Sequence, residues 1–496
     1  MKYAMDVKIN VKPVFSNMVH SGWWEGPCRV GPVETGTPEF ERRSGMEQVK
    51  LWYEELQQNL DFTRCNLMKP LYLEFDETFV VKEDEFQKLL EDSHEVDLYL
   101  LTYRVPGIER LHKAVSMINL GPTPVDVVSF YRAIGEEAYM AHDYEEYNHL
   151  LALLQTKKAV ASTKMLILSF AEQTPTSANM SIYDYVGLFQ RFGIRNNRID
   201  FRQVFNYYDS TPVDEKIREE ARQIIADAER SDVTQENLCN DLQYYHAVRK
   251  MMEQYDCNAF TTPCKELCAS QLPQKYKFVP CMCHSLNKDD RIPSACEEDS
   301  AALVTMMVMM YLTRQSVFMG NPVLVRADHS MPQQTGFLSK LVTAVPDEKY
   351  RFDHDVLEIH HAVPSRRMKG FHQPEQKYEL GHVTTQGWGA HYQIDLAEGN
   401  PVVTLGRFNR DGTKMHVAVA HALGCDFRPY YCSPAVYYDI EGGAREFRQS
   451  LVRNGYGPHQ CIIYGNHVKE LQELGEVMGF DVEYFQGSCR VLEVRT

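Results

Sequence analysis

The spacing of strand-like segments changes near residue 340, and this change constrains the fold more than any other feature of the sequence. Before it, short apolar runs alternate with helical patterns, which is typical of βα units and a parallel sheet. After it, strand-like runs follow one another closely with turn residues between them. That spacing is typical of an antiparallel sheet or barrel. The chain therefore combines two kinds of architecture.

The length of 496 residues suits about three domains of ~150 residues each. We expect an α/β fold made of two Rossmann-like α/β domains followed by a C-terminal antiparallel β-barrel-like domain. The expected ranges are 1–157 for the N-terminal α/β domain, 158–340 for the middle α/β domain, and 341–496 for the barrel-like domain with an α/β tail.

The patterns predict individual elements in each part. In the N-terminal part they predict strands over Asp6–Phe15, Val96–Tyr103 and Val125–Tyr131, and helices over Met46–Leu60 and Asp84–Asp92. In the middle part they predict a strand over Lys164–Phe170 and helices over Ser181–Phe192, Lys216–Arg230 and Glu236–Tyr255. In the C-terminal part the expected strands are Ser339–Val345, Val356–Ala362, Gln376–Thr385, Ala390–Leu396 and Pro401–Phe408. The tail reads as strand Cys461–Tyr464, helix Asn466–Met478 and strand Asp481–Phe485.

Composition excludes several classes of function. The chain carries 52 basic and 68 acidic residues, a net charge of −16, so clustered positive charge for nucleic acid or an anionic membrane is not expected. No apolar run reaches the ~20 residues that span a bilayer. The N-terminus lacks the apolar core of a signal peptide. We therefore expect a cytoplasmic protein whose thirteen cysteines are free thiols.

The segment Cys281–Asn321 is the most informative for chemistry. A loop ending at Pro293 leads into a predicted long helix, with Glu297, Glu298 and Asp299 in its first turn. A structural explanation is available, because acids in a first turn complement the helix dipole and Ser294 to Glu297 fits a capping box. A functional explanation is that these carboxylates line a site.

Histidines are concentrated in the C-terminal third, where ten of the eighteen lie between His354 and His467. His360 and His361 end a strand-like run, and neighbouring side chains of a strand face opposite ways, so only one can point into a given site. His459 lies in a Gly/Pro loop at the start of a strand, a place from which a side chain can project into a cleft.

These segments together resemble the L-fucose isomerase/L-arabinose isomerase family. The resemblance rests on Pro293–Asp299 before an apolar helix, on His360 to Pro364, and on Gly457-Pro458-His459. Supporting segments are Lys157–Ser169, Thr404–Phe408 and Asp411–Met415. The resemblance covers roughly residues 160–496 well and the first 160 weakly.

The resemblance implies aldose–ketose isomerisation through an enediol, with Mn²⁺ or another divalent metal. It implies that Glu297 binds the metal and moves a proton, and that His459 and His360 are further ligands. Carboxylate and imidazole ligands suit such an ion, and proton transfer between two carbons needs positioned acids. It also implies a homo-oligomer, a trimer or hexamer, with a small-molecule sugar as substrate.

One departure from the family pattern concerns the second acid, whose position is occupied by Asn321. An amide can ligate a metal, but it cannot accept a proton at neutral pH. Asp328 and Asp299 are candidates to replace it. The alternatives are a lyase or epimerase on the same scaffold, or a non-catalytic sugar-binding homologue.

Two tryptophan segments are candidates for substrate contact. Trp388 lies between two predicted barrel strands and could stack on a sugar face. Trp23, next to Trp24, follows the first predicted strand, and ligands often bind at the ends of strands in α/β sheets. A loop aromatic that covers the barrel end, for Trp388, and an oligomer contact or local core, for Trp23, remain open alternatives.

Overall fold

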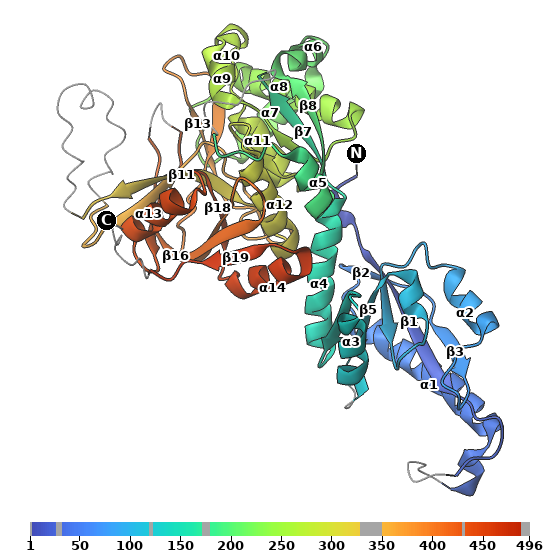
Figure 1. The fold of residues 1–496 in the computed structure, drawn as a ribbon. Coiled ribbons are helices and arrows are strands. Elements are labelled where there is room, and N and C mark those ends of the chain that lie inside the picture. The colour runs from blue at the N-terminus through green and yellow to red at the C-terminus, as the bar shows by residue number, and fades with distance from the viewer. Residues whose placement is uncertain are drawn as a thin grey trace. The chain divides into compact units, whose positions relative to one another are not determined.

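The computed structural model describes residues 2–25, 32–118, 123–170, 179–327, 350–428 and 432–487. The chain divides into two compact units (Figure 1). One comprises Val7–Lys158, and the other comprises Met1–Asp6 together with Ala159–Thr496. The boundary falls inside helix α4 (Tyr144–Ala161).

The unit Val7–Lys158 is built on a parallel sheet of six strands in the order β2-β1-β4-β5-β6, with β3 also paired to β1. The strands are β1 (Ile9–Met18), β2 (Cys65–Leu67), β3 (Leu71–Phe75), β4 (Leu98–Leu101), β5 (Ala114–Ile118) and β6 (Ala138–Ala141). The helices are α1 (Pro38–Asn59), α2 (Glu83–Leu90), α3 (Thr123–Ala133) and α4. Alternation of strand and helix produces this sheet, because parallel strands need crossover connections.

The prediction of a strand over residues 125–131 is wrong, because these residues lie in α3. The buried positions in this stretch include Val127, Val128 and Tyr131, which have helical spacing. Pro124 also stands in the first helical turn, where a missing N–H costs nothing. The run is rich in β-branched residues, which favour strands, and this preference is stronger in the sequence than the helical spacing of the buried positions.

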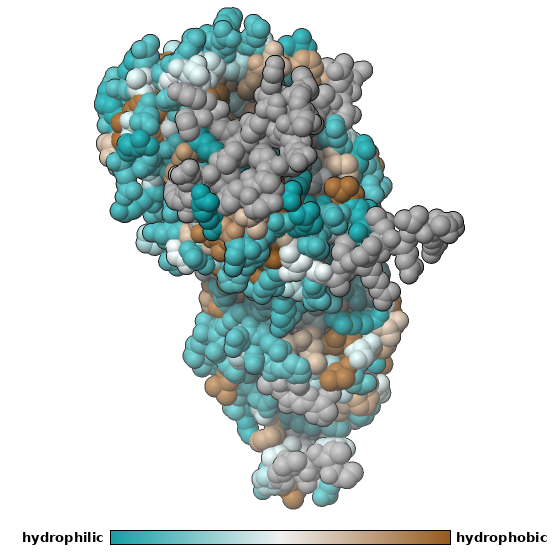
Figure 2. Space-filling model, turned by 90° about the vertical axis from the view of Figure 1, so that its left-hand side faces the viewer, coloured by the Kyte–Doolittle hydropathy of each residue, from teal (hydrophilic) through white to brown (hydrophobic). Residues whose placement is uncertain are grey.

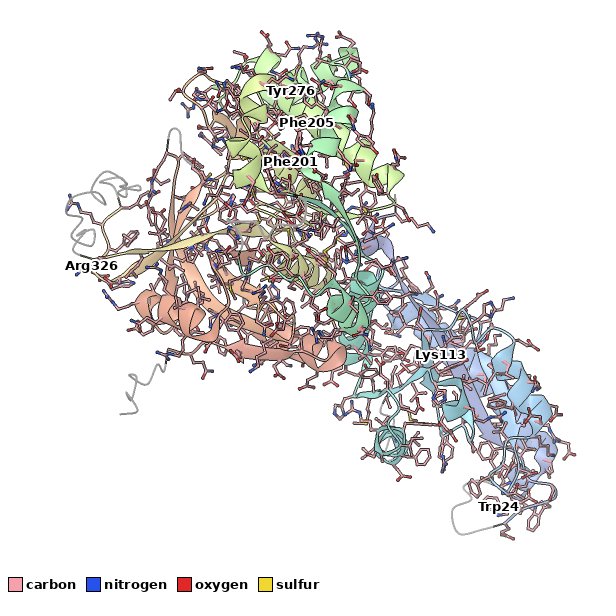
Figure 3. All side chains as sticks on the ribbon, turned by 45° about the horizontal axis from the view of Figure 1, so that its top comes forward. Trp24, Lys113, Phe201, Phe205, Tyr276 and Arg326 are labelled. Carbon is pink, nitrogen blue, oxygen red and sulfur yellow. The ribbon has the colours of Figure 1, made fainter. Side chains whose placement is uncertain are left out.

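The second unit contains a parallel sheet of four strands in the order β10-β9-β7-β8. These are β7 (Lys164–Ser169), β8 (Arg195–Asp200), β9 (Ala259–Thr261) and β10 (Ser294–Ala295). The helices of this region are α5 (Tyr185–Phe192), α6 (Val204–Asp209), α7 (Glu215–Asp227), α8 (Gln235–Gln254), α9 (Cys264–Ala269), α10 (Leu272–Tyr276), α11 (Cys281–Asp289) and α12 (Ser300–Thr313). Aromatic rings join several of them, for example Phe205 stacked on Tyr276 near Phe201 (Figure 3).

The same unit also contains a closed barrel of six antiparallel strands in the order β15-β18-β11-β12-β17-β16. Pairing of β15 with β16 closes it. The strands are β11 (Phe318–Val325), β12 (Val356–His360), β15 (Val402–Phe408), β16 (Lys414–Asp426), β17 (Ala435–Ile440) and β18 (Gln460–Tyr464). Alternate residues from all six strands belong to one buried cluster, so this face is the barrel interior.

The strands that form the barrel are not all those that the sequence predicts for it. The predicted strands 376–385 and 390–396 exist as β13 (Glu379–His382) and β14 (Ala390–Gln393), but they form a separate two-stranded sheet. Their places are taken by β11, which lies before residue 340, and by β16 and β17. The predicted strand Ser339–Val345 lies outside the described residues. The tail supplies β18, helix α14 (Val468–Met478) and β19 (Asp481–Tyr484), which pairs with β16, and helix α13 (Ala444–Asn454) precedes β18.

The exposed residues and the helices can be compared with what a membrane-spanning segment needs. On the face shown in Figure 2, hydrophilic residues predominate and hydrophobic ones form small groups. Among the residues described, no helix has both the length and the apolar character needed to cross a bilayer.

The buried carboxyl group of Asp241 ties α8 to the polypeptide around it. One of its oxygens accepts the backbone N–H of Val279 and the other accepts that of Ala390, both at 2.8 Å. Burial raises the pKa of Asp241 to about 8, although the two N–H groups oppose the shift.

Because an amide has only one acceptor oxygen, Asp241→Asn is expected to leave one buried N–H unpaired. It should lower the free energy of unfolding by ~1–3 kcal/mol in urea titrations. Asp209→Asn, at an exposed position, should change it little.

Candidate metal centre

Three side chains from separate segments of the second unit meet in one group: Glu297, His361 and His459. Their ligand atoms all lie within 4.8 Å of one another. Glu297 follows β10, His361 follows the last residue of β12, and His459 precedes the first residue of β18. His361 Nε2 lies 3.6 Å from Glu297 Oε1, and His459 Nε2 lies 3.3 Å from Glu297 Oε2. Both histidines are buried, whereas Glu297 keeps 20 % of its side chain exposed.

The backbone before α12 presents Glu297 to this group. The predicted placement of Glu297 to Asp299 in the first helical turn is wrong, because α12 begins at Ser300 and Asp299 is its N-cap. Glu297 and Glu298 have φ values of 63° and 54°, a conformation rare for non-glycine residues. Such strain concentrates at functional sites. The Glu298 backbone N–H donates to the carbonyl of Thr262 at 2.8 Å and anchors the bend.

A chain of buried charges holds His459 in place. Its Nδ1 lies 2.7 Å from Asp299 Oδ2, and the same oxygen accepts from Arg407 Nη1 at 2.5 Å. The Arg407 Nε also donates to the carbonyl of Tyr456 at 2.8 Å. All three charged or titratable side chains of this chain, Asp299, Arg407 and His459, are fully buried. Asp299 thus fixes which ring nitrogen of His459 faces Glu297, as a carboxylate behind a metal-binding histidine does.

The electrostatics of the group follow from this arrangement. Burial disfavours the charged form of Asp299, but Arg407 and His459 outweigh it and hold the pKa of Asp299 below its usual value. Burial likewise opposes ionisation of Glu297, yet the two imidazoles lower its pKa. Burial works against protonation of His459, but Asp299 and Glu297 raise its pKa to about 9. Glu297 and Asp299 are therefore anionic at neutral pH.

The residues present fit a divalent cation. Among the described residues, the buried ring nitrogens of His361 and the buried Nε2 of His459 make no well-formed hydrogen bond, although both Nε2 atoms face the Glu297 carboxylate, at 3.6 and 3.3 Å. Two imidazole nitrogens and one carboxylate oxygen form the mixed N/O donor set that manganese, zinc or iron accepts. An unpaired buried nitrogen costs free energy in the metal-free protein, which a bound cation would recover.

Helix α11 carries a buried cation, Lys288. Its ammonium donates to the carbonyls of Val317, at 3.0 Å, and Val363. Burial lowers the pKa of Lys288 to about 8. The unfolded chain, with a lysine pKa of about 10.4, therefore binds more protons than the folded protein between these values.

Stability is consequently expected to rise with pH between about 8 and 10.4, by about 3 kcal/mol from this residue. The measurement is the urea unfolding free energy of the parent and of Lys288→Met across this range. Since other groups titrate equally in both proteins, the difference isolates Lys288. A constant difference between the two curves would contradict the assignment.

The group of potential ligands contains His361 and not its neighbour His360, which the sequence predicts as a ligand. His360 Nδ1 lies 3.0 Å from Glu358 Oε1, and Glu358 is ion-paired with Arg428 at 2.7 Å. Asn321 is paired in register with His360, so the two side chains share the face opposite to that of His361. Neither Asn321 nor His360 belongs to the group of potential ligands found among the described residues.

The remaining predicted residues lie elsewhere. Asp328 lies outside the described residues. Trp388 lies in the loop joining β13 and β14, where its backbone N–H donates to Thr384 Oγ1 and its ring centroid is 5.6 Å from Lys277 Nζ. Trp23 belongs to the unit Val7–Lys158, with 53 % of its surface exposed and its indole N–H donating to the carbonyl of Val33.

The sequence did not identify His361 as a member of the group or Arg407 as the partner of Asp299. The adjacent pair His360-His361 did indicate that a histidine would face the site, because only one of two neighbouring residues of a strand can do so. It did not indicate which of the two. No sequence signal distinguished Arg407, because a lone arginine in a strand pattern is usually exposed.

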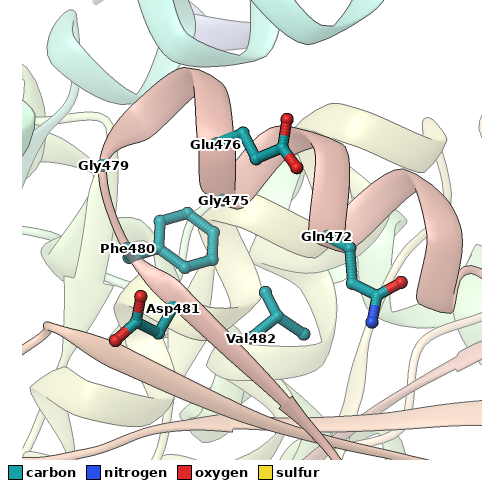
Figure 4. Close-up of a pocket in the computed structure, with 7 residues that line it drawn as sticks. All are labelled: Gln472, Gly475, Glu476, Gly479, Phe480, Asp481 and Val482. Atoms are coloured by element: carbon teal, nitrogen blue, oxygen red, sulfur yellow. The ribbon is translucent and has the colours of Figure 1, made fainter.

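Two surface hollows among the described residues lie apart from this group. One, of about 640 Å³, lies between α14 and β19 beside Gly475 and Phe480 (Figure 4). The other, of about 420 Å³, lies beside Tyr245 and Arg249 of α8. Neither contains a residue of the metal-ligand group.

Comparison of the chain with family models finds no match, and comparison with curated protein sequences finds none either.

Proposed function

We propose that this protein is a metal-dependent aldose–ketose isomerase, an intramolecular oxidoreductase that acts on a sugar or modified sugar through an enediol. The observation that carries the proposal is the group Glu297, His361 and His459, whose ligand atoms lie within 4.8 Å of one another. The resemblance of the segments around Glu297 and His459 to the L-fucose/L-arabinose isomerase family supports it.

Glu297, His361 and His459 would hold Mn²⁺ or another divalent ion, which when bound acts as a Lewis acid that polarises the sugar carbonyl. Glu297 is anionic at neutral pH and remains partly exposed, so its carboxylate can take the proton from the carbon beside the carbonyl. Asp299 keeps His459 oriented and is itself occupied by His459 and Arg407. Asp299 is therefore a positioning residue and not the second acid.

Proton transfer between two carbons also needs a second acid besides Glu297. Asn321 faces away from the group, so it is not proposed as a proton carrier, and Asp328 remains a candidate. A lyase or epimerase is the second candidate function, and a single carboxylate in the described group favours it. With one base and no second acid, the enediol would be diverted or reprotonated at its own carbon.

The proposal also includes the remaining expectations about domains, assembly and location. These are Rossmann-like α/β domains over 1–157 and 158–340, a barrel-like domain over 341–496 to which β11 adds a strand from before residue 340, a trimer or hexamer, and a cytoplasmic location. A small-molecule sugar is the expected partner, without nucleic acid or membrane. Trp388 and Trp23 remain candidate substrate contacts.

The test begins with metal content, measured by mass spectrometry on purified protein before and after addition of Mn²⁺. The Mn²⁺-loaded protein is then incubated with aldoses and ketoses in D₂O and followed by NMR. An isomerase is expected to conserve substrate mass and to incorporate one deuterium at carbon. A product of lower mass indicates a lyase, and deuterium exchange with inversion at the same carbon indicates an epimerase. Absence of Mn²⁺ binding would remove the basis of the proposal.

A further inference from the structure

Helix α9 carries two cysteines one helical turn apart. Cys264 is its first residue and Cys268 its fifth. Side chains four residues apart lie on the same face of a helix. Cys268 is exposed, Cys264 is partly exposed, and both are free thiols. A small reagent can therefore reach this pair from solvent, and the proposed isomerase reaction uses neither residue.

The two thiols also interact with each other. The interaction with Cys264 raises the pKa of the Cys268 thiol above its usual value. The interaction with Cys268 lowers the pKa of Cys264, but Cys296 and burial outweigh it, so that this pKa is raised too. Both thiols are therefore protonated at neutral pH. Because the thiolate is the reacting form, exchange with a disulfide is expected to be slow at pH 7 and faster as the pH rises.

The spacing of the pair permits a disulfide, but a strained one. Cα atoms four residues apart in an α-helix are about 6 Å from each other, inside the ~4.4–6.8 Å range of disulfides. Their Cβ atoms are ~5–6 Å apart, whereas a disulfide brings them to ~3.5–4.5 Å. The backbone of α9 must therefore bend, and few helical bonds oppose this in a helix of six residues. Strained disulfides are easily reduced, so the bond should be reversible.

The start of α9 is tied to the bend that presents Glu297. The carbonyl of Thr262 accepts the backbone N–H of Glu298 at 2.8 Å and that of Cys264 at 2.9 Å. Glu297 and Glu298 both have positive φ values, so this bend depends on its anchor. A movement at the start of α9 therefore acts on the carbonyl that anchors the metal-ligand candidate Glu297.

We propose that Cys264 and Cys268 form a dithiol that a small disulfide oxidises reversibly to an intramolecular disulfide, and that this oxidation weakens metal binding at Glu297. The modification site follows from α9 itself. The effect on metal binding rests on the proposed function and adds control of the metal centre by the redox state.

The reaction is a thiol–disulfide exchange with oxidised glutathione as the oxidant. The exposed Cys268 loses its proton and attacks one sulfur of the glutathione disulfide, which releases one glutathione that takes up the proton. Cys264 then attacks the sulfur of Cys268 and releases the second glutathione with the second proton. Two electrons pass from the two cysteines to glutathione, and one S–S bond is formed for the one that is broken.

The first test is made on the metal-free protein, incubated with oxidised glutathione at pH 8.5, alkylated and digested with trypsin. Trypsin cleaves after Lys265, between the two cysteines, so only a disulfide joins the two resulting peptides. Mass spectrometry is expected to find these peptides linked, and separate after dithiothreitol. At pH 7 the linked form should appear at least about tenfold more slowly, since each pH unit lowers the thiolate fraction about tenfold.

Matched variants identify the pair. Cys268→Ser and Cys264→Ser should abolish the linked peptides, whereas Cys432→Ser, at another exposed cysteine, should retain them. Only glutathione adducts in the parent, or a disulfide of Cys264 with Cys296, would overturn the proposal. So would a rate that does not increase between pH 7 and pH 8.5.

The second test compares Mn²⁺ affinity by calorimetry in the reduced and the oxidised parent, after small molecules are removed. The oxidised parent should bind Mn²⁺ about 10–100-fold more weakly, as when a metal ligand loses its outer support. Dithiothreitol treatment should restore the affinity. Cys268→Ser, treated with oxidised glutathione in the same way, should keep the affinity of the reduced parent.

The outcomes separate the two proposals. Equal Mn²⁺ affinity in the reduced and the oxidised parent overturns control of the metal centre and leaves the proposed function standing. An equal loss of affinity in treated Cys268→Ser also overturns it, because other thiols would then be responsible. Absence of Mn²⁺ binding by the reduced parent overturns the proposed function and the control of it, whereas the tryptic map still judges the dithiol.

Discussion

Glu297→Gln is expected to fold as the parent protein does and to lose Mn²⁺ affinity by more than about a hundredfold. Loss of an outer partner of a ligand already costs ~10–100-fold, and Glu297 is the only anion among the three candidate ligands. The amide that replaces it is neutral and cannot accept a proton, so sugar turnover should disappear with the metal. The measurements are Mn²⁺ titration calorimetry, NMR assay of sugar conversion, and circular dichroism to verify folding.

The matched control for this variant is Glu253→Gln, which alters an exposed acid on α8. It should bind Mn²⁺ as the parent does. Parent-like Mn²⁺ affinity in Glu297→Gln would place any metal site of this protein elsewhere, and full activity in that variant would remove Glu297 from the mechanism.

Arg407→Met should destabilise the protein by about 3–5 kcal/mol, because it leaves the buried Asp299 carboxylate without its cation. The carbonyls of Tyr456 and His459 also lose their donor. Urea unfolding is followed through Trp388 fluorescence, in a background where the other three tryptophans, Trp23, Trp24 and Trp52, are phenylalanine. Trp388 belongs to the same compact unit as Arg407, so it reports on that unit.

The double variant Asp299→Asn/Arg407→Met separates charge from packing. Removing both charges eliminates the uncompensated anion, so the double variant should be more stable than Arg407→Met alone. Its Mn²⁺ affinity should still fall about 10–100-fold, since His459 loses the carboxylate that orients it. A double variant less stable than Arg407→Met would show that the ion pair is not the source of the stability.

Local patterns were reliable where one rule dominated. The strand β7 and the helices α7, α8 and α14 are confirmed close to the predicted bounds, because each combines a clear apolar period with a start or stop signal. Helix α14, for instance, ends at Gly479 in the left-handed conformation that favours glycine. The strand predicted over 125–131 failed because residue preference and periodicity conflicted there.

For the candidate site, too, the local sequence predicted some features and not others. Glu297 and His459 were singled out from their surroundings in the sequence, and they do meet in the structure. The choice between His360 and His361 depended on strand direction, because adjacent residues face opposite sides. The pairing of Asn321 with His360 on the far face could not be read from helix and strand spacing.

The sequence alone determined the mixed α/β character, the change to closely spaced strands, and two of the three residues of the candidate metal centre. These depend on local periodicity and residue chemistry. Only the tertiary structure decided which strands close the barrel, that β13 and β14 stay outside it, and that Asp299, Arg407 and His459 form a buried charge chain. Such contacts join segments more than a hundred residues apart, so they follow from packing of distant surfaces and not from any local pattern.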